Sequence, residues 1–426
     1  MTKQFLSCYA IALLMIIAGS TLQAQTVSKT DSLLNAVNKR TVFLENLKLS
    51  GYVQTQLQFA DSQGIRSFAG GNFEPGVDKR FMVRQGRLKV VYETKSGMYY
   101  VQINVNEKGV TIKDAFLKFK LPWTKWLAIQ AGIYNRPFGF EIPFSSSNRE
   151  SPERSRLEQT LFPQERDLGA ELIIEAPSTS KLKGLKVEAG MYNGAGQGVD
   201  FDFQKDFMGR LSYNKSLSDN KIKFGIGVST YNGGVRQSTK KIYTDVMQIN
   251  DSTVGYMVDS TITNLNEIAT RQYMGADVQF SYTSGIGTTT LRGEFIQGIQ
   301  PGTSSSNMSP VKDPAADTYI RNFNGAYFYF IQGFMKDKHQ LVFKYDFLDP
   351  NTDVAGNEIG QTGSKLGLAD LKFSTIGIGY IWNVDKQLKC VVYYDVVTNE
   401  TSANLGNYAN DLKDNVVTFR IQYRFP

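Results

Sequence analysis

The strongest constraint on the fold is a period-two alternation of apolar and polar residues that recurs along nearly the whole chain. In the segment 414–425, for example, Phe419 and Ile421 alternate with Arg420 and Gln422. Alternation over this length predicts a β-strand with one apolar face. We expect sixteen such strands, at 47–60, 80–93, 98–107, 110–121, 125–135, 166–177, 184–193, 205–216, 221–231, 271–283, 287–298, 324–335, 338–348, 372–383, 387–397 and 414–425.

The links between these segments alternate in length. Every second link is short, as in the TKSG and MKDK turns, and only the link near Glu107 is short where a long one is due. The other links are mostly long, at 61–79, 136–165, 232–270, 299–323, 349–371 and 398–413. Short turns on one rim and long loops on the other are typical of outer-membrane barrels. An even number of strands puts both chain ends on the short-turn side.

Composition favours an all-β membrane protein over a helical one. The chain contains 27 Phe, 22 Tyr and 38 Gly, and beyond its N-terminus no apolar run approaches the roughly 18 residues of a spanning helix. Trp123, Trp126 and Trp382 adjoin short turns, where an interfacial aromatic girdle is expected. We therefore predict a 16-stranded antiparallel transmembrane β-barrel, which is wide enough to hold a water-filled lumen.

The N-terminus predicts export. Lys3 precedes an apolar run from Phe5 to Ala18, and small residues follow up to Ala24, after which cleavage is expected. The predicted organisation is a signal peptide at 1–24, a periplasmic N-terminal segment at 25–46 and the barrel at 47–426.

The segment 25–46 leaves two possibilities open. It is polar overall but carries Leu33, Leu34, Val37 and Leu44 at roughly helical spacing. A run this short is marginal as an isolated helix. It is therefore either a partly ordered segment or a small oligomerisation helix.

Residue content argues against an enzyme or a cofactor protein. His339 is the only histidine, no G-x-S-x-G motif is present, and the Gly-rich stretches lack the Lys-Ser/Thr of a phosphate loop. We therefore predict no catalytic residue, metal site or cofactor. The net charge of +7 suggests a basic surface or pore lining rather than a nucleic-acid partner, since an exported chain rarely meets nucleic acid.

The link 136–165 is the main candidate for a functional loop, because links of this length inside a compact sheet are normally functional or disordered. We predict that it folds into the barrel as a pore-constricting third loop. In this interpretation Arg149, Arg154 and Arg156 reach the narrowest point. A surface loop with internal ion pairs is the alternative, since Glu153 and neighbouring acids offset these charges.

Alternate residues of a strand face the same side, and this parity predicts further cations in the lumen. It places Arg87, Lys118 and Lys120 inward, whereas Arg84 points outward unless a bulge at Gly86 switches the face. A mixed, solvated lumen is the alternative meaning of these charges. Parity also places four aromatic residues in the lumen: Tyr52, Tyr100, Phe116 and Tyr134.

Short motifs in a fixed order resemble those of the phosphate-selective porins O and P and their relatives. They are RQGRL at 84–88, DAFLKF at 114–119, AGIYNRPFGFE at 131–141, ERS at 153–155, RDLGAEL at 166–172, YNGAGQGVD at 192–200, FKYDFLDPN at 343–351 and FRIQYRF at 419–425. The resemblance implies a trimeric outer-membrane porin whose third loop constricts each pore. Two features depart from the family: the arginine-rich second strand is only partly kept, and the chain ends on Pro426 after the terminal aromatic residue.

The expected function is passive diffusion of small hydrophilic anions, with phosphate as one candidate, across the outer membrane of a Gram-negative cell. The alternatives are a general porin for neutral or mixed small solutes such as oligosaccharides, and a structural or adhesive barrel. Expected partners are small anionic solutes, outer-membrane lipid, two further copies in a homotrimer, and the outer-membrane assembly machinery, which would engage the C-terminal strand.

Overall fold

The computed structural model describes residues 29–124 and 126–425, so the predicted signal peptide lies outside the described residues. The described chain separates into two units between residues 48 and 49. In the first unit, helix α2 (Lys29–Asn46) bears out the helical spacing, and Leu34, Val37 and Leu44 are exposed on it. The function of this segment stays a prediction. Among the described residues no helix is long and apolar enough to cross a membrane.

The second unit is built from one sheet, which is antiparallel except where a short piece of strand β10 (Ile242–Asn250) pairs in parallel with strand β14 (Thr318–Phe334). The described residues contain 18 strands in this sheet, and two of them, β10 and β11 (Thr253–Asp259), form a hairpin within one long link, which leaves 18 − 2 = 16 strands in the wall. The wall strands are β1 (Leu47–Ala60), β2 (Lys79–Glu93), β3 (Gly97–Asn106), β4 (Gly109–Lys120), β5 (Leu127–Asn135), β6 (Arg166–Glu175), β7 (Leu185–Tyr192), β8 (Asp206–Leu217), β9 (Ile222–Arg236), β12 (Ile268–Thr283), β13 (Thr288–Gly302), β14 (Thr318–Phe334), β15 (His339–Asp349), β16 (Phe373–Asn383), β17 (Leu388–Asn399) and β18 (Val416–Phe425).

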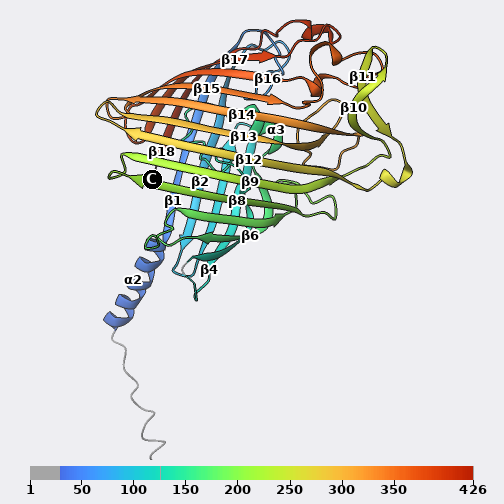
Figure 1. Ribbon diagram of the computed structural model, residues 1–426. Helices are drawn as coiled ribbons and strands as arrows, with labels where there is room; N and C mark the ends of the chain where they lie inside the picture. The colour runs from blue at the N-terminus through green and yellow to red at the C-terminus, as the bar shows by residue number, and fades with distance from the viewer. Residues whose placement is uncertain (1–28, 125, 426) are drawn as a thin grey trace, which may run out of the picture. The chain divides into compact units, whose positions relative to one another are not determined.

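The wall closes on itself. β1 pairs with β18 from Gly51↔Phe425 to Ala60↔Val416 and also pairs with β2, while β9 pairs directly with β12. A closed sheet leaves no strand edge unpaired, as a barrel in hydrocarbon requires. The predicted 16-stranded antiparallel barrel is confirmed (Figure 1).

The two rims differ as the link lengths predicted. Links 94–96, 218–221, 335–338 and 384–387 are tight turns on one rim, and the long links stand on the other. Figure 1 shows β10 and β11 at the end opposite the C-terminus. This hairpin was not expected in the link 232–270, although Asn250, Asp251 and Ser252 supply a turn between two β-prone runs.

Burial alternates along the strands with the predicted faces. On β18, Phe419, Ile421 and Tyr423 are exposed on the outer surface, whereas Arg420 and Gln422 are buried inside. An apolar outer face and a polar inner face suit a barrel surrounded by lipid. Trp123, Trp126 and Trp382 are exposed beside short turns, where the girdle was predicted.

A buried apolar cluster lies inside the barrel, between the link 136–165 and part of the wall. Phe138, Leu157 and Phe162 come from the link, and Tyr231 and Tyr273 come from β9 and β12. The rings of Phe162 and Tyr273 meet edge to face at 5.7 Å. We call residues 136–165 the inner loop, because its apolar side chains occupy the interior next to this wall.

Candidate functional site

The inner loop starts at a turn that requires glycine. Gly139 has φ +60°, and a Cβ on it would lie 1.8 Å from Glu294 Oε1. The Gly139 amide donates to Ser229 Oγ at 3.0 Å, and the Phe140 amide donates to Glu294 Oε2 at 2.9 Å. The start of the loop is thus fixed to β9 and β13.

A buried carboxylate fixes the middle of the loop to the opposite part of the wall. Glu153 accepts from Arg84 Nε at 2.9 Å and Arg84 Nη2 at 2.6 Å, and from Arg420 Nη2 at 3.1 Å. Burial opposes ionisation of this carboxyl, but the two guanidinium groups outweigh burial and lower the pKa of Glu153 to about 2. The bidentate pair therefore ties the loop to β2 and β18.

The segment around Ser146 and Ser147 binds the same side of the barrel. Ser146 Oγ donates to Gln85 Oε1 at 2.7 Å. The carbonyl of Ser147 accepts from Gln422 Nε2 at 3.1 Å and from Lys389 Nζ at 2.9 Å. Side chains of β2, β17 and β18 therefore hold the backbone of the loop in place.

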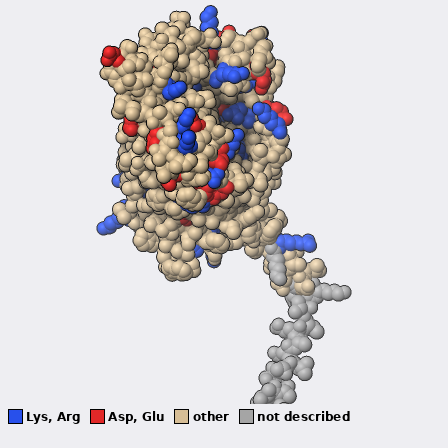
Figure 2. All heavy atoms as spheres, turned by 90° about the vertical axis from the view of Figure 1, so that its right-hand side faces the viewer, with Lys and Arg blue, Asp and Glu red and all other residues tan. Residues whose placement is uncertain are grey.

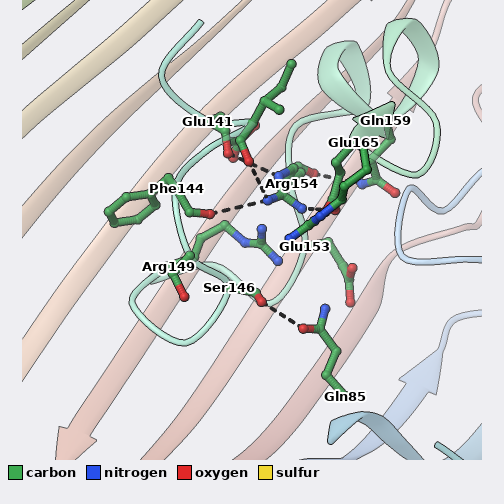
Figure 3. Close-up of polar contacts among 12 residues, drawn as sticks. Gln85, Glu141, Phe144, Ser146, Arg149, Glu153, Arg154, Gln159 and Glu165 are labelled. Carbon is green, nitrogen blue, oxygen red and sulfur yellow. Dashed lines mark hydrogen bonds and ion pairs between the residues drawn. The ribbon is translucent and has the colours of Figure 1, made fainter. Parts of the chain in front are cut away.

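Arg154 connects the two ends of the loop (Figure 3). Its Nε donates to Glu141 O at 3.1 Å, and its Nη2 donates to Ile142 O at 3.1 Å and Phe144 O at 3.3 Å. Its Nη1 forms an ion pair with Glu165. Most of the donors of this arginine are therefore used within the loop itself.

Arg149 and Arg156 also serve the structure of the loop. Arg149 is 4% exposed and donates to backbone carbonyls of residues 151 and 152. Arg156 opens the short helix α3 (Arg156–Leu161), donates to Ser67 O and stacks over the Phe373 ring at 4.4 Å. Among the described residues, neither arginine lines the two cavities described next.

A cavity of 470 Å³ separates the inner loop from the β1–β8 side of the wall, and we call it the turn-side cavity. Arg87 and Lys118 line it, as does Arg154. Arg87 donates only to the neutral side chains of Gln85, at 3.2 Å, and Gln102, at 3.4 Å. Within the described part of the chain, Arg87 and Lys118 form no ion pair. The carboxylates of Asp114, Glu171 and Glu188 line the same cavity, but none of them pairs with either cation.

Lys120 lies closer to the rim than Lys118. It is exposed and forms an ion pair with Glu93 at 3.3 Å. It lines a separate pocket beside Trp126 at the short-turn rim. Lys120 therefore stands at the entrance rather than in the turn-side cavity.

A second cavity, of 410 Å³, lies toward the long loops, and we call it the loop-side cavity. Arg87 and Arg154 line both cavities and so stand where the two approach each other. Beside them, Arg166 donates to both oxygens of Asp114 at 3.2 Å and forms an ion pair with Glu165. The charge of Arg166 is therefore largely balanced.

All four aromatic residues that parity placed in the lumen line the turn-side cavity: Tyr52, Tyr100, Phe116 and Tyr134. The rings of Tyr100 and Phe116 stack at 4.7 Å, and Phe116 meets Tyr134 edge to face at 5.7 Å. That prediction is confirmed.

Arg84, whose direction the sequence left open, points inward. Arg84 reaches Glu153 and Gln85 reaches Ser146, so two consecutive side chains of β2 face the interior. Such an irregularity is what a β-bulge produces. The alternation of β2 is therefore broken between Arg84 and Gln85, whereas Arg87 faces the cavity in normal alternation with Gln85.

The sequence did not reveal which residues pair with one another. Glu153 pairs with Arg84 and Arg420 rather than with the arginines of its own loop, and Arg166 pairs with Asp114; these contacts join residues far apart in the chain. The signals available were the inward parity of Arg420 and the position of Arg166 at the start of a strand.

Charged side chains also mark the long-loop end of the barrel. Figure 2 shows this end, where basic and acidic side chains lie together in the middle of the face. One outer ion pair there joins Arg236 and Asp313. Among the described residues, no group of three or more His, Cys, Asp or Glu is placed to hold a metal ion.

The structure is similar to solved outer-membrane channels, although no protein-family model and no curated protein sequence matches the chain. OprB of Pseudomonas putida is 9% identical, with a TM-score of 0.56 over 92% of this chain and 97% of that chain. The channel DcaP of Acinetobacter baumannii is 11% identical, with a TM-score of 0.52 over 89% and 97%. An anion-selective porin from Comamonas acidovorans is 12% identical, with a TM-score of 0.50 over 89% and 99%. At these identities the likeness concerns the fold, which is that of outer-membrane porins.

Proposed function

We propose that this chain is an outer-membrane porin for passive diffusion of small hydrophilic anions, phosphate among them, and acts as a channel rather than an enzyme. The observation that carries the proposal is the pair Arg87 and Lys118, which line the turn-side cavity and form no ion pair within the described residues. A cation without a carboxylate partner projects its charge into the adjoining water, where a mobile anion can balance it.

In this proposal the inner loop is the constriction, and solutes pass between the turn-side and loop-side cavities beside Arg87. Fixed charges control ion entry when the passage is no wider than the Debye length, about 8 Å at physiological salt. The guanidinium group of Arg87 can also hold two phosphate oxygens at once, which the ammonium group of Lys118 cannot.

The remaining predicted residues act less directly. Arg149, Arg154 and Arg156 position the loop and add long-range positive potential, and Lys120 attracts anions at the rim. Because Arg154 and Lys120 have carboxylate partners, we expect each to contribute less to selectivity than Arg87 or Lys118.

The test is the reversal potential of single channels in a KCl gradient at low salt. Replacing both cations, Arg87→Gln with Lys118→Gln, should shift the reversal potential toward zero or cation preference. The matched control removes the same charge from an exposed short turn, Lys336→Gln with Lys338→Gln, and should keep the parental value. A parental reversal potential in the Arg87/Lys118 variant would refute the proposal.

A general porin for neutral solutes such as oligosaccharides is the second candidate. The aromatic lining of the turn-side cavity favours it, because ring faces stack on the apolar faces of sugars. Swelling of proteoliposomes in neutral sugars, with no anion preference in the KCl gradient, would support this function over the first.

The same proposal includes the contacts of the protein with lipid, with the assembly machinery and with further copies of itself. The apolar outer face contacts outer-membrane lipid, the C-terminal strand is recognised by the outer-membrane assembly machinery, and the mature chain forms a homotrimer after removal of the signal peptide. The mass of the detergent-solubilised particle measures the oligomeric state.

A further inference from the structure

Two sets of aromatic rings line the turn-side cavity. Tyr100 and Phe116, stacked with 15° between their planes, come from β3 and β4 of the wall. Phe140 and Phe144, stacked at 5.1 Å with 30° between their planes, come from the inner loop. A solute in this cavity therefore meets ring faces on both the wall and the loop.

The same cavity supplies charge and neutral hydrogen-bonding groups. Arg87 and Lys118 are its cations without an ion pair in the described chain. Five amide side chains also line it, among them Gln130, Asn214 and Gln279. A bare inorganic anion could bind the cations and accept hydrogen bonds from the amide N–H groups, but it would make no use of the ring faces, so the rings are unexplained by diffusion of such ions.

We propose that the turn-side cavity is a binding site for sugar phosphates, which enter it more favourably than inorganic phosphate. This inference rests on the proposed anion-preferring porin and names the solute class of the same site. The phosphate would be bound by Arg87 and Lys118, the sugar ring would lie against the aromatic faces, and its hydroxyl groups would bond to the amides.

A solute that lacks either the phosphate or the sugar would leave part of the cavity lining without a partner. A neutral sugar would leave Arg87 and Lys118 without a counter-ion. An aromatic carboxylate would satisfy the cations and stack on the rings, but it has no hydroxyl groups to donate to the amide oxygens of the lining. The volume of 470 Å³ falls in the range of about 300–1,000 Å³ usual for small-molecule sites.

The experiment measures the concentration that half-blocks the current through the unmodified protein in planar bilayers. The probes are glucose 6-phosphate, inorganic phosphate, glucose and benzoate. Glucose 6-phosphate should block at a concentration at least about tenfold below the others, as one additional favourable contact of ordinary strength would produce. Equal block by phosphate, glucose or benzoate overturns the inference.

A pair of variants tests the aromatic contribution. Phe116→Leu should raise the half-blocking concentration of glucose 6-phosphate about two- to tenfold, the effect of losing one aromatic contact, and leave that of phosphate unchanged. Phe119→Leu is the control, since Phe119 is exposed on the outer face of the same strand. The four-probe comparison needs no variant, so it stands even where Phe116→Leu does not fold.

The two proposals fail in different ways. A channel that prefers anions in the KCl gradient but is blocked equally by phosphate and glucose 6-phosphate overturns the sugar-phosphate site and leaves the porin function intact. A channel without anion preference overturns the proposed function itself.

Discussion

The cations of the inner loop and those of the β2–β4 wall have similar side chains but different partners. Arg154 donates to three backbone carbonyls and forms an ion pair with Glu165. Arg87 donates only to neutral amides, and Lys118 forms no ion pair in the described chain. The first set of charges is used to fold the loop, and the second forms no ion pair within the described residues.

This difference shows that the number of arginines in a loop is a poor measure of pore potential. A buried guanidinium needs hydrogen-bond acceptors and usually a counter-charge, because desolvation is expensive. Once these partners are in place, the counter-charge cancels much of the electric field of the guanidinium group nearby. In the proposed function, the cations that govern selectivity are therefore those that form no ion pair with a carboxylate.

The largest expected effect comes from removing the charge that fixes the loop. Glu153→Gln leaves the buried Arg420 and the partly exposed Arg84 without a counter-charge, and breaking such a buried pair typically costs about 3–5 kcal/mol. We expect the inner loop to detach, single-channel conductance to rise, and added protease to cut within 136–165. Glu74→Gln, in an exposed loop position, is the control and should behave like the parent. An uncut loop with parental conductance in Glu153→Gln would show that this contact does not fix the loop.

The acid dependence of the loop gives the second prediction. The pKa of Glu153 falls from 4.5 to about 2 in the folded protein, where burial is outweighed by Arg84 and Arg420. A depressed carboxyl pKa stabilises the fold above pH 4.5, and about 3 kcal/mol of this stabilisation is lost as the pH falls through 2. Protease cleavage of the loop should therefore increase in acid with the parent, and Glu153→Gln should lose this dependence.

Glu158, in the same loop, has a carboxyl pKa that is shifted in the opposite direction. Burial, then Glu294 and Glu141, raise the pKa of its carboxyl, so Glu158 is protonated more readily in the folded protein. A raised carboxyl pKa weakens the packing as the pH rises toward and through the folded pKa. Glu158→Gln should abolish the loosening of the loop that accompanies a rise in pH and should keep the acid response. Loss of the acid response in this variant would contradict the assignment to Glu153.

The sequence was sufficient to predict the wall but not the ion pairs of the interior. Alternation is a local property, so residues such as Ile421 and Gln422 reveal their faces directly. The contact of Arg420 with Glu153 joins residues 267 positions apart, and nothing in either local sequence announces it. Arg84 was ambiguous for a related reason, because the break in alternation between Arg84 and Gln85 depends on how β2 meets the loop.

The smallest expected effect compares two lysines on the same face of β4. Lys118 lines the turn-side cavity and forms no ion pair in the described chain, whereas Lys120 is exposed at the rim and pairs with Glu93 at 3.3 Å. An exposed, paired charge is screened by salt and changes little when removed. Lys118→Gln should thus shift the reversal potential measurably at low salt, and Lys120→Gln should shift it less. Raising the salt should erase the Lys120 effect first. Equal shifts of the reversal potential in both variants would contradict this prediction. They would mean that an ion pair with a carboxylate does not reduce the contribution of a lysine to selectivity, and that selection takes place at the rim.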